Sequence, residues 1–134
     1  MFNSIMENIQ SHLALLDLAL QSSGRIKAYA QIEDLDNVAD ETENRERIIN
    51  IVGHIQHKVE KQIDLLTAQD LSDDSLPILK SWFQDLATWT DKMTSLDAET
   101  VELLADQKEA TTREIVTIFK NKEVFKGYNL SNKK

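Results

Sequence analysis

Apolar residues recur at intervals of three or four along most of the chain, the pattern of helices that each bury one face. The first stretch predicts a helix over residues 3–31, capped by Asn3 or Ser4. A break at Ser22–Gly24 is an alternative, but we favour a break at residues 33–36, where two aspartates can cap the next helix. The apolar positions of this first stretch are Phe2, Ile5, Ile9, Leu13, Leu16, Leu20, Ile26, Tyr29 and Ile32.

The same spacing predicts three further helices, over residues 35–69, 75–95 and 97–122. An acidic loop at residues 70–74 separates the first two, and Pro77 falls in a first helical turn, where proline is tolerated. Asp97 is the expected cap of the last helix. We therefore expect an all-α protein: an elongated antiparallel bundle of four helices (residues 1–122) with a long helical hairpin. A flexible basic C-terminal tail is expected at residues 123–134.

Two apolar stripes weaken in the middle. Thr42 and Arg45 interrupt the helix at residues 35–69, and Lys108 and Thr111 interrupt the helix at residues 97–122. Burying an unpaired arginine or lysine costs several kcal/mol, so we expect these stretches to face solvent or a partner. Apolar helix surface that is only partly covered is typical of interaction sites.

The composition agrees with a small helical domain. The chain has 134 residues, 41% of them hydrophobic, with only three glycines and one proline, too few for the many turns of a sheet protein. Without cysteine there is no disulfide scaffold, thiolate metal site or cysteine nucleophile. No apolar run approaches the roughly 20 residues that span a bilayer, and no basic signal-peptide region precedes the first helix. We expect a cytoplasmic protein without membrane insertion.

The charge is unevenly distributed. Residues 1–107 hold 8 basic and 20 acidic side chains, a net charge of −12, whereas residues 108–134 hold 7 basic and 3 acidic ones, a net charge of +4. An acidic body repels phosphates, so nucleic acid and anionic lipid are not expected partners. The basic segment either contacts its own acidic body or docks on a second, acidic protein.

Candidate chemistry is sparse. The chain has no glycine-rich phosphate motif, no Glu-x-x-His pair and no nucleophile–base set with recognisable spacing. His54 and His57 are more typical of a solvated helix face than of a metal site. His12 lacks the lysine three positions later and the glycine four positions later that histidine phosphotransfer domains carry. Trp82 and Trp89, at heptad spacing, are expected in the core, with a groove for a partner as the alternative. We expect no enzyme activity, cofactor or metal.

Several segments resemble one family of bacterial proteins. They are Ala28–Asp36, then Val38 and Glu43–Ile49, and near the end Arg113–Ile115, Phe119–Lys122 and Phe125–Tyr128. This order of a first helix, an acidic break, an Arg-Glu pair before an apolar run and a basic end closing on tyrosine resembles the FlgN/FliT type of flagellar export chaperone. The resemblance covers most of the chain, although residues 131–134 extend past the tyrosine.

The resemblance implies a cytoplasmic type III secretion chaperone. Such proteins bind an amphipathic terminal helix of an axial flagellar protein, hook-associated or filament-cap, and prevent its assembly before export. The resemblance implies substrate binding near Ile115, Ile118 and Phe119. It also implies contact with the flagellar export apparatus at Tyr128 beside Phe125. The alternative is a self-associating helical adaptor or regulatory protein without a flagellar role, and a homo-oligomer is possible in either case.

Overall fold

The computed structural model describes residues 2–71 and 74–133, and the side chains of all of these except Phe119 and residues 121–133. The contacts divide the chain into two compact units, Met1–Thr100 and Val101–Lys134. We call them the N-terminal unit and the C-terminal unit and describe each by itself.

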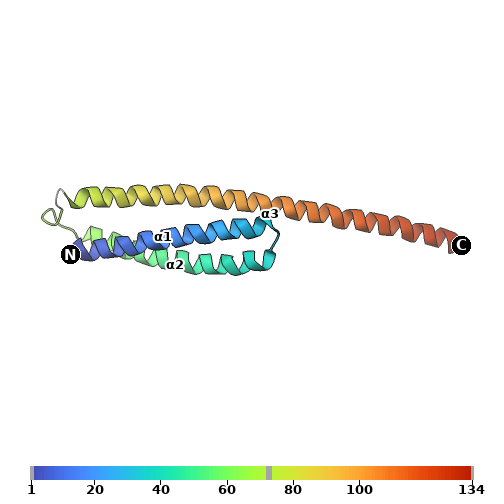
Figure 1. Cartoon of the computed structure of the whole chain (residues 1–134), viewed down its shortest axis with the longest axis horizontal. Helices are drawn as coiled ribbons and strands as arrows, with labels where there is room; N and C mark the ends of the chain where they lie inside the picture. The colour runs from blue at the N-terminus through green and yellow to red at the C-terminus, as the bar shows by residue number, and fades with distance from the viewer. Residues whose placement is uncertain (1, 72–73, 134) are drawn as a thin grey trace. The chain divides into compact units, whose positions relative to one another are not determined.

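Three helices make up the described residues: α1 (Phe2–Gln31), α2 (Leu35–Asp64) and α3 (Ser75–Lys133). The prediction of an all-α fold is confirmed. In the N-terminal unit, α1, α2 and the Ser75–Thr100 part of α3 run alongside one another as a three-helix bundle (Figure 1). The C-terminal unit consists of the remaining residues of α3.

The break between the first two helices lies where the sequence predicts it. Helix α1 continues through Ser22–Gly24 and ends at Gln31. The Asp34 carboxylate then caps α2 by accepting a hydrogen bond from the Asn37 backbone N–H at 3.3 Å. Helix α2 ends at Asp64, five residues before the predicted boundary. Beyond it, Thr67 donates from its backbone N–H and its hydroxyl to the Asp70 carboxylate, a local arrangement that competes with the helix.

The turn after α1 is a Schellman motif with an unusual residue at its key position. The Asp34 N–H donates to the Tyr29 carbonyl at 2.9 Å, and the Glu33 N–H donates to the Ala30 carbonyl at 3.1 Å. Glu33 sits at φ 59°, the left-handed region where glycine is usual because a Cβ is strained there.

Glu33→Gly is therefore expected to raise the free energy of unfolding by about 1 kcal/mol, because it removes that Cβ strain. Urea unfolding followed by helical circular dichroism measures the change. Glu33→Ala is the matched control: it removes the same carboxylate but keeps the Cβ. Equal stabilisation by both variants would show that charge, and not backbone strain, is responsible.

The predicted break between a third and a fourth helix is wrong. Helix α3 runs without interruption from Ser75 to Lys133, so the expected four-helix arrangement is not found in the described residues. The segment around Asp97 contains no glycine or proline, and an aspartate inside a helix costs less than about 1 kcal/mol. Residues 123–133, predicted as a flexible tail, are also assigned to α3, and their side chains lie outside the described set.

An apolar core cluster joins the three helices of the N-terminal unit. Partly buried residues pack around its buried members, which are Ile5, Ile9, Val59, Leu79 and Trp82. Trp82 is the largest fully buried side chain of the described residues, as its predicted core position requires. Burying one large apolar side chain contributes about 1.5–3 kcal/mol, so this cluster is the main source of stability.

A polar clamp joins the three helices further along the bundle. Arg45 of α2 donates to the Ser23 hydroxyl of α1 at 2.8 Å and to the Asp97 carboxylate of α3 at 2.5 Å. The Ser23 hydroxyl in turn lies 3.4 Å from the Met93 sulfur of α3, to which it donates. The prediction that Arg45 faces solvent or a partner is wrong: Arg45 is half-buried and paired within its own bundle.

A second polar contact fixes α1 against α2. Glu41 accepts hydrogen bonds from Arg25 at 2.8 Å and from the buried Ser22 hydroxyl at 2.7 Å. The Arg25 hydrogen bond is the main cause that lowers the pKa of Glu41, with Ser22 and Asn44 adding to it against the effect of burial. The carboxylate therefore stays ionised, and the contact persists, at neutral pH.

Candidate helix-binding surfaces

A groove runs between α1 and α3 on the surface of the N-terminal unit. It consists of three adjoining hollows of about 210, 210 and 480 Å³. Leu13 and Asp85 line both the first and the second hollow, and Leu20 and Lys92 line both the second and the third, so the three form one continuous surface. We call it the α1/α3 groove.

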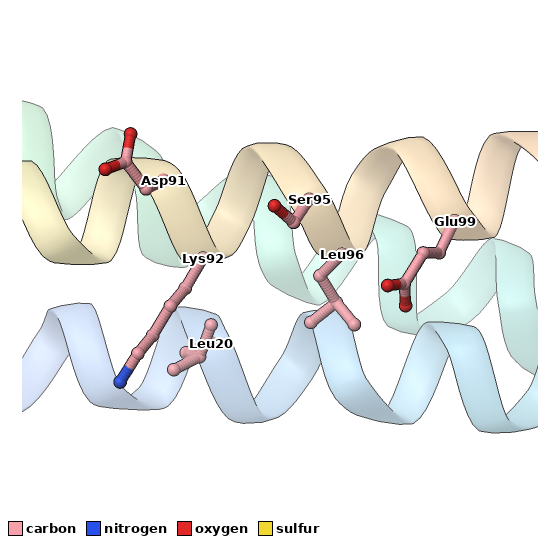
Figure 2. A pocket seen from close by; sticks show the side chains of 6 residues that line it. All are labelled: Leu20, Asp91, Lys92, Ser95, Leu96 and Glu99. Carbon is pink, nitrogen blue, oxygen red and sulfur yellow. The ribbon is translucent and has the colours of Figure 1, made fainter.

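Apolar side chains form the floor of this groove. In its largest hollow, Leu96 points from α3 toward α1, while Lys92 extends from α3 across to α1 beside Leu20 (Figure 2). In the middle hollow the half-buried Trp89 fixes one wall, because its indole N–H donates to the Leu16 carbonyl of α1 at 2.8 Å. This hydrogen bond holds the apolar indole ring against α1, and an apolar wall of this kind suits an amphipathic helix.

The charged residues of the groove are mostly acidic. Asp17, Asp85, Asp91 and Glu99 line it, against one basic residue, Lys92. Glu99 is paired with Lys27, whereas the three aspartates form no ion pair with any residue in the described ranges. An open apolar floor with acidic edges favours a partner that is apolar and basic.

A second apolar surface lies on the C-terminal unit. Ile115, Val116 and Ile118 are 47%, 45% and 62% exposed. Two of them, Ile115 and Ile118, are residues for which the resemblance implies substrate binding. Phe119, the third residue for which the resemblance implies substrate binding, has a side chain outside the described set. The same holds for Phe125 and Tyr128, for which the resemblance implies contact with the export apparatus.

Sequence reasoning missed two parts of these surfaces. To predict the α1/α3 groove, one must know which faces of the helices pack together, and the periodicity of each helix does not specify this. Val116 was not predicted as part of the apolar surface because it lies outside the stripe formed by Ile115 and Ile118. The signal that could have identified it is its apolar side chain directly after an isoleucine.

The histidines form no catalytic or metal-binding arrangement with other residues in the described part of the chain. His12 is fully buried, and the Trp82 indole N–H donates to its Nδ1 at 3.0 Å. Phosphotransfer needs an exposed imidazole, so this geometry does not suit that chemistry. No group of three or more His, Cys, Asp or Glu side chains capable of holding a metal ion occurs among the described residues.

Burial sets the protonation state of His12. Desolvation lowers the pKa of His12, and this exceeds the raising effects of the Gln56 side chain and the Glu60 carboxylate on α2. Because Nδ1 accepts from Trp82, the neutral ring carries its proton on Nε2. That atom is buried and forms no hydrogen bond with any described residue.

Comparison with known proteins gives no relative. No family model matches the chain, and neither a curated protein nor a solved structure is similar to it. Within the described ranges, no helix combines the length and the apolar character needed to cross a membrane.

Proposed function

We propose that this protein is a chaperone that binds an amphipathic helix of another protein. The observation that carries the proposal is the apolar group Ile115, Val116 and Ile118, which α3 leaves uncovered in the C-terminal unit. Exposed apolar surface is stabilised when a partner covers it, by about 25 cal/mol for each Å² removed from water. An amphipathic helix covers such a surface with its own apolar face.

The resemblance to FlgN/FliT proteins narrows the proposed partner. The bound helix would be a terminal segment of an axial flagellar protein, either hook-associated or from the filament cap, held in the cytoplasm before export. Such segments carry apolar seams that drive assembly, and a chaperone that covers a seam delays it. Phe125 and Tyr128 are the proposed contacts to the export apparatus, an assignment that rests on the resemblance alone.

The test is binding of purified terminal segments of hook-associated and filament-cap proteins from the same organism, measured by isothermal titration calorimetry. The wild type is expected to bind one of them, and Ile115→Asp/Ile118→Asp is expected to weaken binding at least ~10-fold, because a carboxylate buried in an apolar interface is poorly solvated. Both residues are exposed in the free protein, so helicity should be unchanged.

Ala110→Asp/Thr117→Asp is the matched control. These residues of α3 are exposed, stand outside the apolar group and receive the same added charge. The control should bind as the wild type does. If both double variants weakened binding equally, the added negative charge, and not the loss of the apolar group, would be responsible. If no axial segment binds the wild type, the self-associating adaptor becomes the better description.

A further inference from the structure

The two apolar surfaces of this protein carry opposite charge. The α1/α3 groove has four acidic side chains and one basic one. The segment that carries Ile115, Val116 and Ile118 is weakly basic: residues 108–120 hold three basic side chains (Lys108, Arg113 and Lys120) and two acidic ones (Glu109 and Glu114), a net charge of +1. Opposite potentials on two apolar surfaces favour their association.

Charges bracket the apolar residues on both surfaces over a similar length. On α3 of the groove, Asp85 and Glu99 are 14 residues apart and enclose Trp89 and Leu96, a span of about 21 Å at 1.5 Å per residue. On the C-terminal unit, Lys108 and Lys120 are 12 residues apart and enclose the apolar group, a span of about 18 Å.

Both lysines are available for such a contact. Their side chains are exposed, and neither forms an ion pair with a described residue. Exposed Asp17 lies across the groove from Asp85, so the acidic edge includes α1 as well as α3. Long lysine side chains can cover apolar surface while placing their charge beside a carboxylate at its edge.

We propose that the α1/α3 groove binds residues 108–120 of a second copy of this chain. In this head-to-tail contact Ile115 and Ile118 of one copy, which share a helix face, pack on the floor formed by Leu16, Leu20 and Leu96 of the other. The flanking lysines lie beside the acidic edge. The contact joins two different surfaces, so every copy offers one donor helix and one acceptor groove.

This inference concerns the same apolar group as the proposed function, but it does not depend on any cargo. It is tested on the pure protein, by sedimentation equilibrium of the full chain over a range of concentrations. The weight-average mass is expected to rise above 15.3 kDa with concentration. The rise should shrink between about 50 mM and 500 mM NaCl, because salt screens exposed charges.

Charge exchange identifies the surfaces involved. The groove variant Asp17→Lys/Asp85→Lys and the helix variant Lys108→Glu/Lys120→Glu should each self-associate at least ~10-fold more weakly than the wild type, because each places like charges together. An equimolar mixture of the two should associate again, since the groove of the first then matches the helix of the second. Asp40→Lys/Glu46→Lys, on the exposed surface of α2, is the charge-matched control and should associate as the wild type does.

Three results would overturn the proposal: a wild type that is monomeric throughout, reversal variants that associate like the wild type, or a mixture that stays monomeric. A monomeric wild type whose groove variant loses binding to an axial segment would assign the groove to that foreign helix instead. Failure of self-association leaves the chaperone proposal standing, and failure of cargo binding leaves this one standing, so the two are tested separately.

Discussion

Trp82→Ala is expected to lower the free energy of unfolding by about 3–5 kcal/mol, the largest effect of any single substitution considered. The side chain is 1% exposed and packs with residues of all three helices in the main core cluster. Its removal leaves a cavity that rigid neighbours fill only in part. It also removes the hydrogen bond from the Trp82 indole N–H to His12, leaving the buried Nδ1 atom without its donor.

The neighbouring Phe83 gives a matched control. Its ring lies 5.1 Å from that of Trp82, but it is 53% exposed, so Phe83→Ala should cost less than about 1 kcal/mol. Urea unfolding followed by helical circular dichroism measures both variants, because this signal does not depend on which tryptophans a variant retains. Similar losses of stability in the two would contradict the central position of Trp82 in the core.

Periodicity predicted the helices well because it depends on burial of one face, which repeats along the chain. Helix α1, the turn after it and the start of α3 at Ser75 all follow from apolar spacing and capping residues. Capping preference alone misplaced the break at Asp97. An aspartate is favourable at a helix start but only mildly unfavourable inside a helix, and local sequence does not decide between the two.

The contacts of Arg45 show why tertiary structure decides whether Asp97 starts a helix or lies inside one. Its partners, Ser23 and Asp97, are 22 and 52 residues away in sequence, and each lies on a different helix. The pair gives Asp97 a role within α3 and gives Arg45 a place inside the bundle. Neither role is visible in the pattern of one helix, and the α1/α3 groove escaped prediction for the same reason.

Acid is expected to destabilise the wild type below about pH 6.5, through His12. Burial lowers the pKa of this imidazole in the folded state, whereas in the unfolded chain it keeps its ordinary value near 6.5. Below that value the unfolded chain binds the proton first, so the free energy of unfolding falls as pH falls. One group contributes at most about 1.4 kcal/mol per pH unit, and the loss ends once pH drops below the folded pKa.

The geometry explains why the folded state resists this proton. In the neutral ring, Nδ1 accepts from the Trp82 indole N–H; in the protonated ring, Nδ1 would carry a hydrogen and face that same donor. Protonation therefore requires the loss of a buried hydrogen bond in addition to the burial of a charge. The Glu60 carboxylate on α2 favours the charged form, and burial outweighs it.

Urea unfolding at several values between pH 7 and pH 5 tests this expectation. His12→Gln removes the titrating group and keeps a side-chain oxygen that can accept from Trp82, so its stability should be nearly constant over this range. His57→Gln, at an exposed position of α2, should retain the pH dependence of the wild type. The groups with lowered carboxyl pKa values, Glu41 and Asp70, titrate below this range and leave the effect of His12 separate. A wild type whose stability does not change, or a His12→Gln variant that loses as much as the wild type, would rule out His12 as the source.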